Sequence, residues 1–325
     1  MRREMNTKKK METEDMERKE FVEEMMADQG EAAKCAACME DGTDGEECEK
    51  SSALGQFSDR VREVSPLIHN ITNYVTVNDC ANVVLACGAS PIMADDINEV
   101  SEITSICTGL NINIGTLNSR TIDSMMIAGQ TSNRLNHPIL LDPVGAGAST
   151  LRTKTATSLM ENVKPWVIRG NMSEIKALAS GSGKTRGVDA DVADAITLEN
   201  LDEGVAFAKA FAARTGAVVA ITGAIDIVAD ASSAFCIFNG HPMMSSITGT
   251  GCMLSAMTTA FVSANPEHVL EATAAAVCTM GVAGEIAHRR LGDMDGNASY
   301  RTYIIDAIYR MSGELLDKEA RYEVR

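Results

Sequence analysis

The 325-residue chain is long enough for one large α/β domain, and its 45% apolar content is ample for a buried core. Its formal net charge of −16 argues against a protein that holds nucleic acid or an anionic membrane surface, because both would repel it. A bound nucleotide is not excluded, since a few backbone N–H groups and one metal ion hold phosphates locally.

Residues 1–55 differ in composition from the rest and are dominated by Glu, Asp, Lys and Met, so we expect a mostly disordered acidic tail there. We find neither the apolar segment of a secretory signal nor a run of eighteen apolar residues, and we therefore expect a soluble, cytoplasmic protein with reduced thiols. Three tail thiols, Cys35, Cys38 and Cys48, fall short of a closed zinc site.

From Val61 onward, short β-like runs alternate with segments of helical periodicity. The expected strands are Ser90–Met93, Leu110–Ile114, Pro138–Asp142, Trp166–Arg169, Ala217–Thr222, Asp226–Ala229 and Ala234–Phe238. The expected helices are Thr76–Cys87, Ser119–Leu135, Thr150–Asn162, Met172–Ala179, Leu198–Arg214, Cys252–Ser263, Pro266–Arg290 and Tyr300–Leu316. The alternation predicts an α/β domain over residues 56–325, with a mostly parallel central sheet and helices on both faces. The last two strands, in direct succession, predict an antiparallel hairpin at a sheet edge.

The segment Thr248-Gly249-Thr250-Gly251-Cys252 opens one of these helices. Its backbone N–H groups can all point one way. At a helix N-terminus they meet the positive end of the helix dipole, which makes an anion hole suited to a phosphoryl group in transit. Cys252 lies in the first turn, where the pKa of a thiol tends to fall. For this motif alone, a glycine-rich helix start with a buried Cys stays an open interpretation.

Polar residues also follow three expected strands. Asp142 precedes a glycine-rich loop, and a carboxylate there either binds Mg²⁺ or caps a helix. Asn171 and Glu174 have the spacing of a capping box, which is compatible with a cation site shared with Asp142. Arg169 suits a phosphate contact, and Thr222 ends another strand. Because the carboxyl ends of parallel strands meet at one edge, we expect these residues to converge with the Gly249–Cys252 loop on one rim.

Further motifs accompany these in a fixed order: Ser65–Asn73, Gly88–Met93, Asn113–Leu117, Leu141–Gly147, Ile168–Asn171, Gly187–Asp189, Ile221–Gly223 and Asn239–His241. From Val61 to about Leu316 the chain thus resembles the hydroxyethylthiazole kinase family, a branch of the ribokinase-like superfamily. It departs from that family's usual turn at Gly296-Asn-Ala-Ser-Tyr300.

The resemblance implies transfer of the ATP γ-phosphoryl group to the alcohol of 4-methyl-5-(2-hydroxyethyl)thiazole, in thiamine salvage. It further implies a homotrimer with active sites between subunits. Carried over by motif, the site residues are Met93, Gly249 and Asn73 for the thiazole, Arg169 and Thr222 for ATP, Asp142, Glu174 and Asn171 for Mg²⁺, and Thr250, Gly251 and Cys252 for catalysis.

Two alternatives stay open. Other ribokinase-like enzymes, such as pyrimidine alcohol kinases or nicotinamide-hydrate dehydratases, typically have an Asp at position 252, so Cys252 counts against them. A binding module without catalysis would lack a residue of the phosphate rim, and none is missing. His69 is interpreted as a structural residue, His241 as a turn residue, and the remaining thiols after Val61 as core.

Overall fold

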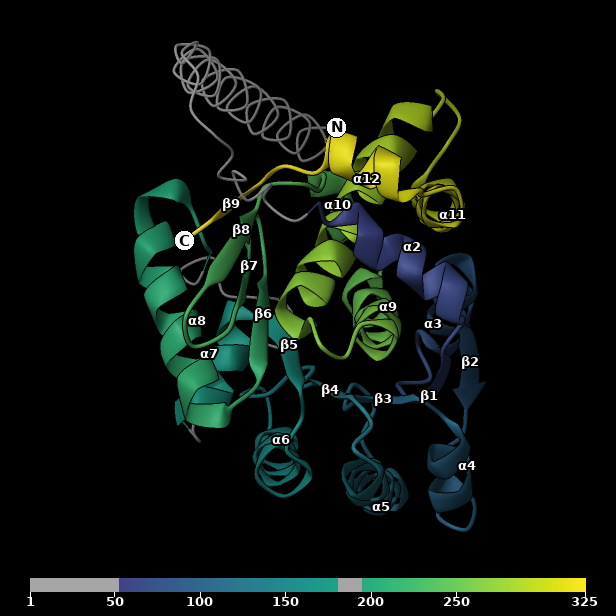
Figure 1. Ribbon diagram of the computed structural model, residues 1–325, viewed down its shortest axis with the longest axis vertical. Coiled ribbons are helices and arrows are strands. Elements are labelled where there is room, and N and C mark those ends of the chain that lie inside the picture. Colours follow the sequence, from purple (N-terminus) through teal and green to yellow (C-terminus); the bar gives the residue numbers. More distant parts are fainter. Residues whose placement is uncertain (1–52, 181–194) are drawn as a thin grey trace, which may run out of the picture. The chain divides into compact units, whose positions relative to one another are not determined.

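The described residues, 53–180 and 195–325 of the computed structural model, form a nine-stranded sheet in the order β2-β1-β3-β4-β5-β6-β7-β8-β9 (Figure 1). They belong to one compact unit, Ala53–Arg325. The Cys35–Cys48 thiols, the motif Gly187–Asp189 and nearly all of the expected tail lie outside the described residues.

Strands β1 to β6 run parallel, and β7, β8 and β9 continue the sheet in antiparallel fashion. The strand bounds are β1 Leu67–Ile71, β2 Ser90–Met93, β3 Gly109–Asn113, β4 Ile139–Asp142, β5 Val167–Asn171, β6 Val218–Thr222, β7 Asp226–Ala229, β8 Ala234–Ile237 and β9 Tyr322–Val324. The mostly parallel sheet is confirmed, and so is the antiparallel hairpin, β7–β8. Its expected place at the edge is wrong, because β9 pairs along β8 and forms the edge itself.

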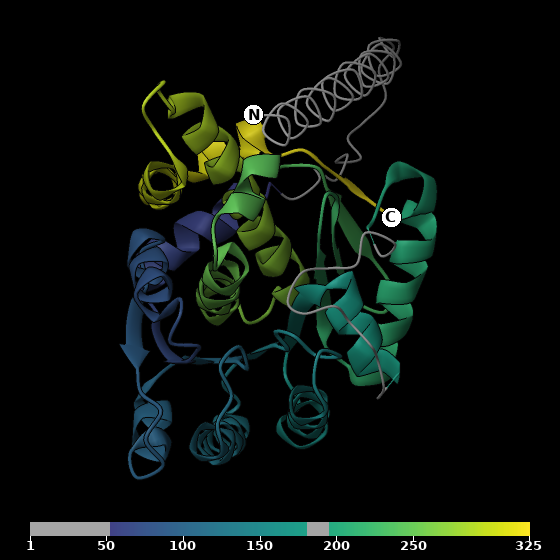
Figure 2. The ribbon, with the colours of Figure 1, turned by 180° about the vertical axis from the view of Figure 1, so that it is seen from behind.

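Helices cover both faces of the sheet, as predicted (Figures 1 and 2). One face carries α4 Val100–Ile106, α5 Ser119–Leu135, α6 Thr150–Val163, α7 Met172–Ser180 and α8 Leu201–Thr215. The other carries α2 Gly55–Val64, α3 Val77–Ala86, α9 Thr250–Ala264 and α10 Val269–Arg290, with α11 Asn297–Tyr309 and α12 Gly313–Glu319 packed outside them. Two short 3-10 helices, η2 Leu198–Asn200 and η3 Pro242–Ser246, precede α8 and α9. The chain moves from β1 to β2 on one side and to β3 on the other, so the connections change faces at β1, which is where α/β sheets open a crevice.

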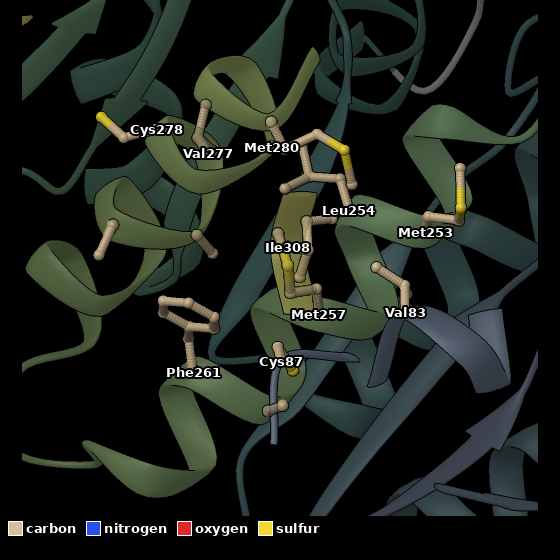
Figure 3. Close-up of a cluster of buried hydrophobic side chains, with 14 of the residues drawn as sticks. Val83, Cys87, Met253, Leu254, Met257, Phe261, Val277, Cys278, Met280 and Ile308 are labelled. Carbon is tan, nitrogen blue, oxygen red and sulfur yellow. The ribbon is translucent and has the colours of Figure 1, made fainter. Parts of the chain in front are cut away.

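A large apolar cluster lies between the sheet and α3, α9 and α10, and residues of α11 join it from outside (Figure 3). Met257 and Phe261 of α9 pack here with Val83 of α3 and Ile308 of α11. By length and composition α10 is apolar enough to cross a membrane, but 72% of its apolar window is buried, as expected of a core helix. From Cys252 onward α9 is buried along nearly its whole length, and it packs against β1, β3 and β4.

Several elements differ from the sequence prediction. The expected helix Tyr300–Leu316 is two helices, because Ser312 caps α12 by accepting a hydrogen bond from the Leu315 backbone N–H at 3.1 Å. Strands β1 and β9 and helices α2 and α4 were not predicted as elements. The cysteines expected in the core are confirmed, since all six cysteines in the described part of the chain are buried and free.

Candidate active site

The carboxyl ends of β4, β5 and β6 lie side by side, next to the first turn of α9. From β5, Arg169 Nη2 donates to Thr222 Oγ1 at the end of β6, at 2.5 Å. Arg169 Nη1 lies 3.7 Å from Asp142 Oδ2 at the end of β4. A Cβ atom on Gly251 of α9 would overlap the same Nη1, so the guanidinium and the helix start are in close contact. The structure therefore brings the expected rim residues together.

Asp142 is completely buried at the end of β4. Its Oδ2 accepts hydrogen bonds from Asn113 Nδ2 at 2.8 Å and from Ser255 Oγ at 2.7 Å. Its Oδ1 has no hydrogen-bond partner among the described residues. Burial raises the pKa of this carboxyl, and the positive charge of Arg169 and the two donors oppose the rise. One oxygen of the carboxylate is thus fixed, and the other is left without a protein donor.

Glu174 and Asn171 cap the start of α7 reciprocally. The Glu174 N–H donates to Asn171 Oδ1 at 2.8 Å, and the Asn171 N–H donates to Glu174 Oε2 at 2.9 Å, so the predicted capping box is confirmed. Glu174 Oε1 accepts from the Gly145 N–H at 2.7 Å, which ties the glycine-rich loop after β4 to the same carboxylate. Burial and the nearby charge of Asp142 raise the pKa of Glu174 to about 7.

The loop before α9 has the geometry of an anion hole. Gly249 is the N-cap with a φ of 91°, and a Cβ atom there would overlap Thr76 Cγ2, so this position requires glycine. The N–H groups of Thr250, Gly251 and Cys252 follow, in the part of a helix where backbone donors have no intrahelical acceptor. Gly251, in the middle of these donors, lies against the Arg169 guanidinium.

The Cys252 sulfur accepts a hydrogen bond from Asn73 Nδ2 at 3.2 Å. Burial, followed by the negative charge of Asp142, raises the pKa of this thiol, and hydrogen bonds from Asn113, Asn73 and Thr76 only partly oppose the rise. The expectation of a lowered thiol pKa at the helix start is therefore wrong. Loss of hydration and a neighbouring carboxylate outweigh the partial charge of the helix dipole.

A cavity of about 190 Å³ opens at the carboxyl ends of β1, β2 and β3. It is lined by Met93, Thr72, Tyr74, Asn113 and Met125, among others. Of the three expected substrate residues, the structure places Met93 in the wall. Asn73 and Gly249 do not line the cavity but both contact Thr76, one residue before α3. A larger hollow of about 980 Å³ lies at the opposite end of β5 and β6, around Trp166, so size alone does not mark the site.

Two residues that the sequence analysis did not single out connect these parts. Asn113 pairs with Asp142 in the strand register and donates to its carboxylate. Ser255 lies one helical turn after Cys252 and donates to the same oxygen. The i, i+3 spacing on α9 is a sequence signal that would have suggested Ser255. Asn113 required the register of β3 against β4.

His69 and His241, the two histidines interpreted from the sequence, have structural contacts. His69 is buried in β1, with Nε2 2.8 Å from the Ala94 carbonyl and Nδ1 2.9 Å from Thr104 Oγ1, which confirms its structural interpretation. His241 caps η3, accepting from the Met243 N–H at 3.2 Å, and its ring stacks on that of His288. In these contacts neither ring touches Asp142, Arg169 or Thr222.

Comparison with known proteins places this site in a family. Residues 59–314 match the model of the hydroxyethylthiazole kinase family. A hydroxyethylthiazole kinase of Clostridium acetobutylicum is 64% identical over 270 residues, which cover 83% of this chain and 99% of the relative. The structure of the hydroxyethylthiazole kinase protein from Pyrococcus horikoshii OT3 superposes with a TM-score of 0.74 at 35% identity, covering 84% of this chain and 98% of the other.

A pyridoxal kinase from Staphylococcus aureus in complex with ADP superposes with a TM-score of 0.53 at 15% identity, covering 80% of this chain and 97% of that one, a likeness of fold alone. The sheet order and the helices on both faces agree with the ribokinase-like architecture expected from the sequence. The match to the family model spans nearly all of the compact unit, and every rim residue lies within it. The chain belongs to the hydroxyethylthiazole kinase family.

Proposed function

We propose that this protein uses ATP to phosphorylate the primary alcohol of 4-methyl-5-(2-hydroxyethyl)thiazole, as a soluble cytoplasmic enzyme of thiamine salvage. The observation that carries the proposal is the contact of Arg169 with Thr222, Asp142 and the first turn of α9, in a chain of this family. A loose phosphoryl transfer asks a protein mainly for positioning and charge stabilisation, and both are available at this rim.

On the phosphate side, Arg169 and Thr222 bind the ATP phosphates. The guanidinium supplies fixed positive charge, and the donors of Thr250, Gly251 and Cys252 stabilise the charge that develops on the transferred group. In the structure Arg169 already pairs with Thr222, so a phosphate would join or replace that contact rather than order a free side chain. The site is preorganised for an anion.

The rim also fits a magnesium ion, which would neutralise phosphate charge when bound. Asp142 would hold it, because its Oδ1 is buried without a hydrogen-bond partner among the described residues. Glu174 and Asn171 would contribute to its surroundings, and both Glu174 oxygens and the Asn171 oxygen already accept hydrogen bonds from backbone N–H groups. The described residues contain no group of three or more His, Cys, Asp or Glu that could hold a metal. A small number of protein ligands suits Mg²⁺, because water and substrate phosphates usually complete its coordination shell.

On the substrate side, the thiazole would occupy the cavity beside Met93, with Asn73 and Gly249 near its hydroxyethyl group. Cys252 lies beside the hydroxyl as a neutral thiol, because its pKa is raised. Its contribution is therefore to position the alcohol. Tyr74 and Val77 line this cavity and are exposed apolar residues, as is Val75 next to Tyr74 in the chain, which supports an active site completed by a neighbouring subunit of a homotrimer.

The proposal is tested by measuring ADP release with ATP, Mg²⁺ and hydroxyethylthiazole, with the product mass confirmed by mass spectrometry. 5-Ethyl-4-methylthiazole, which lacks the hydroxyl group, is the control acceptor and should give no acceptor-dependent ADP. Chelation of Mg²⁺ should abolish turnover. Absence of thiazole-dependent ADP at millimolar substrate would contradict the proposal.

The rim is tested with Arg169→Gln. Loss of a donor aimed at transition-state charge costs roughly 100-fold in kcat, and the KM for ATP should also rise. Arg214→Gln is the matched control, because Arg214 is exposed at the other end of the sheet and contacts the Ala179 carbonyl and the Phe211 ring. Equal kinetics for the two variants would rule out this role for Arg169.

A further inference from the structure

A chain of hydrogen bonds joins the Asp142 carboxylate to the Cys252 sulfur through two buried amides. Asn113 Nδ2 donates to Asp142 Oδ2 at 2.8 Å, and Asn113 Oδ1 accepts from Asn73 Nδ2 at 3.0 Å. Asn73 Nδ2 then donates to Cys252 Sγ at 3.2 Å. The chain crosses from β4 to β3, to the loop after β1, and to α9. It therefore connects the phosphate side of the site to the substrate side.

The direction of each amide is fixed by a backbone group. The Gly115 N–H can only donate, and it lies 2.9 Å from Asn113 Oδ1, so the oxygen of that amide faces Gly115 and the nitrogen faces Asp142. The Thr76 N–H lies 3.2 Å from Asn73 Oδ1 and orients the second amide in the same way. The Cys252 sulfur consequently receives an N–H, and Asp142 receives one on Oδ2 only.

We propose that Asn113 is a positioning residue of the phosphoryl transfer. Its amide orients the Asp142 carboxylate so that Oδ1 stays free, and it aligns the Asn73 amide on the Cys252 sulfur. This inference rests on the function proposed above. Asn113 touches both halves of the site, since it also lines the 190 Å³ cavity. Ser255, the second donor to Asp142, lies in the buried part of α9 and reaches only the carboxylate in the contacts described.

Asn111 shows that burial alone does not give Asn113 this role. It lies two residues earlier in β3, so its side chain emerges on the same face, and it is completely buried. Its amide donates to Asn70 Oδ1 at 3.0 Å and makes none of the contacts to Asp142, Asn73 or Cys252. An Asn111 variant thus reproduces the loss of a buried amide while leaving the chain from carboxylate to sulfur intact.

The test compares Asn113→Leu with Asn111→Leu, two replacements of similar volume. We expect a drop of at least 100-fold in kcat for N113L and less than threefold for N111L, at comparable losses of thermal stability. In ligand-free protein, alkylation of Cys252 by iodoacetamide, followed by peptide mass spectrometry, should slow at least fivefold in N113L only, since hydrogen bonds to the sulfur favour its thiolate. Equal kcat values or equal alkylation rates for the two variants would overturn the proposal.

Two more variants complete the test. Ser255→Ala should lower kcat without slowing alkylation, because it removes a donor to Asp142 and leaves the sulfur contacts. If N113L does not fold, the isosteric Asn113→Asp serves instead. It should lower kcat at least 30-fold with less than threefold change in the KM for hydroxyethylthiazole, and a kcat near wild type would overturn the proposal. If wild-type protein shows no thiazole-dependent turnover, the proposed function fails, while the alkylation comparison still tests the hydrogen-bond chain.

Discussion

At the residue scale, the pKa of the Cys252 thiol is subject to opposing effects. The start of α9 places the partial positive charge of the helix dipole beside the sulfur, an effect of about 0.3–2 kcal/mol in favour of the thiolate. The sulfur is also buried near the Asp142 carboxylate, and both features favour the neutral thiol. Because the resulting pKa lies above the ordinary value, the thiol keeps its proton at neutral pH. A neutral thiol positions an alcohol but does not accept its proton.

We therefore expect Cys252→Ser to retain kcat within about tenfold of wild type. Serine still accepts the N–H of Asn73, whereas loss of a true general base costs roughly 100- to 10,000-fold. Wild-type kcat should also be flat between pH 7 and 8. Cys278→Ser, at a completely buried core thiol, controls for the cost of a buried hydroxyl. A loss beyond 100-fold, with wild-type kcat rising tenfold per pH unit, would assign the thiolate a catalytic role.

The buried imidazole of His69 leads to a second prediction at this scale, about how the stability of the fold depends on pH. Burial lowers the pKa of its imidazole below the ordinary value of about 6.5, so the native protein resists a proton that the unfolded chain accepts. This group leaves stability unchanged above about pH 6.5 and reduces it as the pH falls below that value. Other groups titrate in the same range, and Glu174, whose pKa is raised to about 7, acts in the opposite sense.

A comparison of variants isolates the histidine. Between pH 7 and 5.5 the free energy of unfolding of wild type, measured by urea denaturation, should fall by about 1 kcal/mol more than that of His69→Gln. His268→Gln, at an exposed position, should behave as wild type. Parallel curves for wild type and H69Q would show that His69 does not resist protonation.

At the element scale, the sequence predicted those strands whose apolar residues run without interruption. Strand β1 was missed because two of its five residues, His69 and Asn70, are polar, and they are buried only because Thr104, Ala94 and Asn111 supply hydrogen bonds. Strand β9 was missed because it forms by pairing with β8, far away in sequence. Helix α4 has seven residues, too few for a clear period.

The site residues likewise divide into those that the sequence could predict and those that it could not. Asp142, Arg169 and Thr222 could be predicted together, because the carboxyl ends of adjacent parallel strands meet wherever the sheet is placed. Asn113 and Ser255 depend on the register of β3 with β4 and on the rotation of α9 about its axis. Neither quantity follows from local sequence, so the amide chain became visible only in three dimensions.

The entry into α9 gives a prediction about an element. Gly249 has a φ of 91° and no room for a Cβ atom beside Thr76, whereas Gly216, at the end of α8, has a φ of 73° and nothing within 4 Å of such an atom. Gly216→Ala should therefore cost only the roughly 1–2 kcal/mol of left-handed strain and keep full activity. Gly249→Ala has to displace Thr76 or the helix start, so we expect a larger loss of stability and at least a 30-fold loss of kcat. Unfolding midpoints and kcat that match for the two variants would contradict this account.

At the scale of the whole molecule, both halves of the site lie at the carboxyl ends of the parallel strands, but on different strands. The proposed phosphate rim lies at β4, β5 and β6, and the proposed substrate cavity lies at β1, β2 and β3, where the chain connections reverse direction. Helix α9 spans the two, contacting β1, β3 and β4. At the rim the Asp142 and Glu174 carboxylates are buried, whereas the cavity is lined in part by the exposed apolar side chains of Tyr74 and Val77. We therefore propose that a second subunit, if it completes the site, packs against the cavity rather than against the rim.

Val75→Lys tests that arrangement. Val75 is 56% exposed and follows Tyr74, which lines the cavity, and Val324 is 56% exposed on β9 at the far side of the sheet, so V324K is a matched control. A lysine in a packed subunit interface buries an unpaired charge, so V75K should sediment as smaller species than the wild-type protein, with the KM for hydroxyethylthiazole raised at least tenfold. V324K should keep both values, and a V75K protein with unchanged sedimentation and KM would place the subunit contact elsewhere.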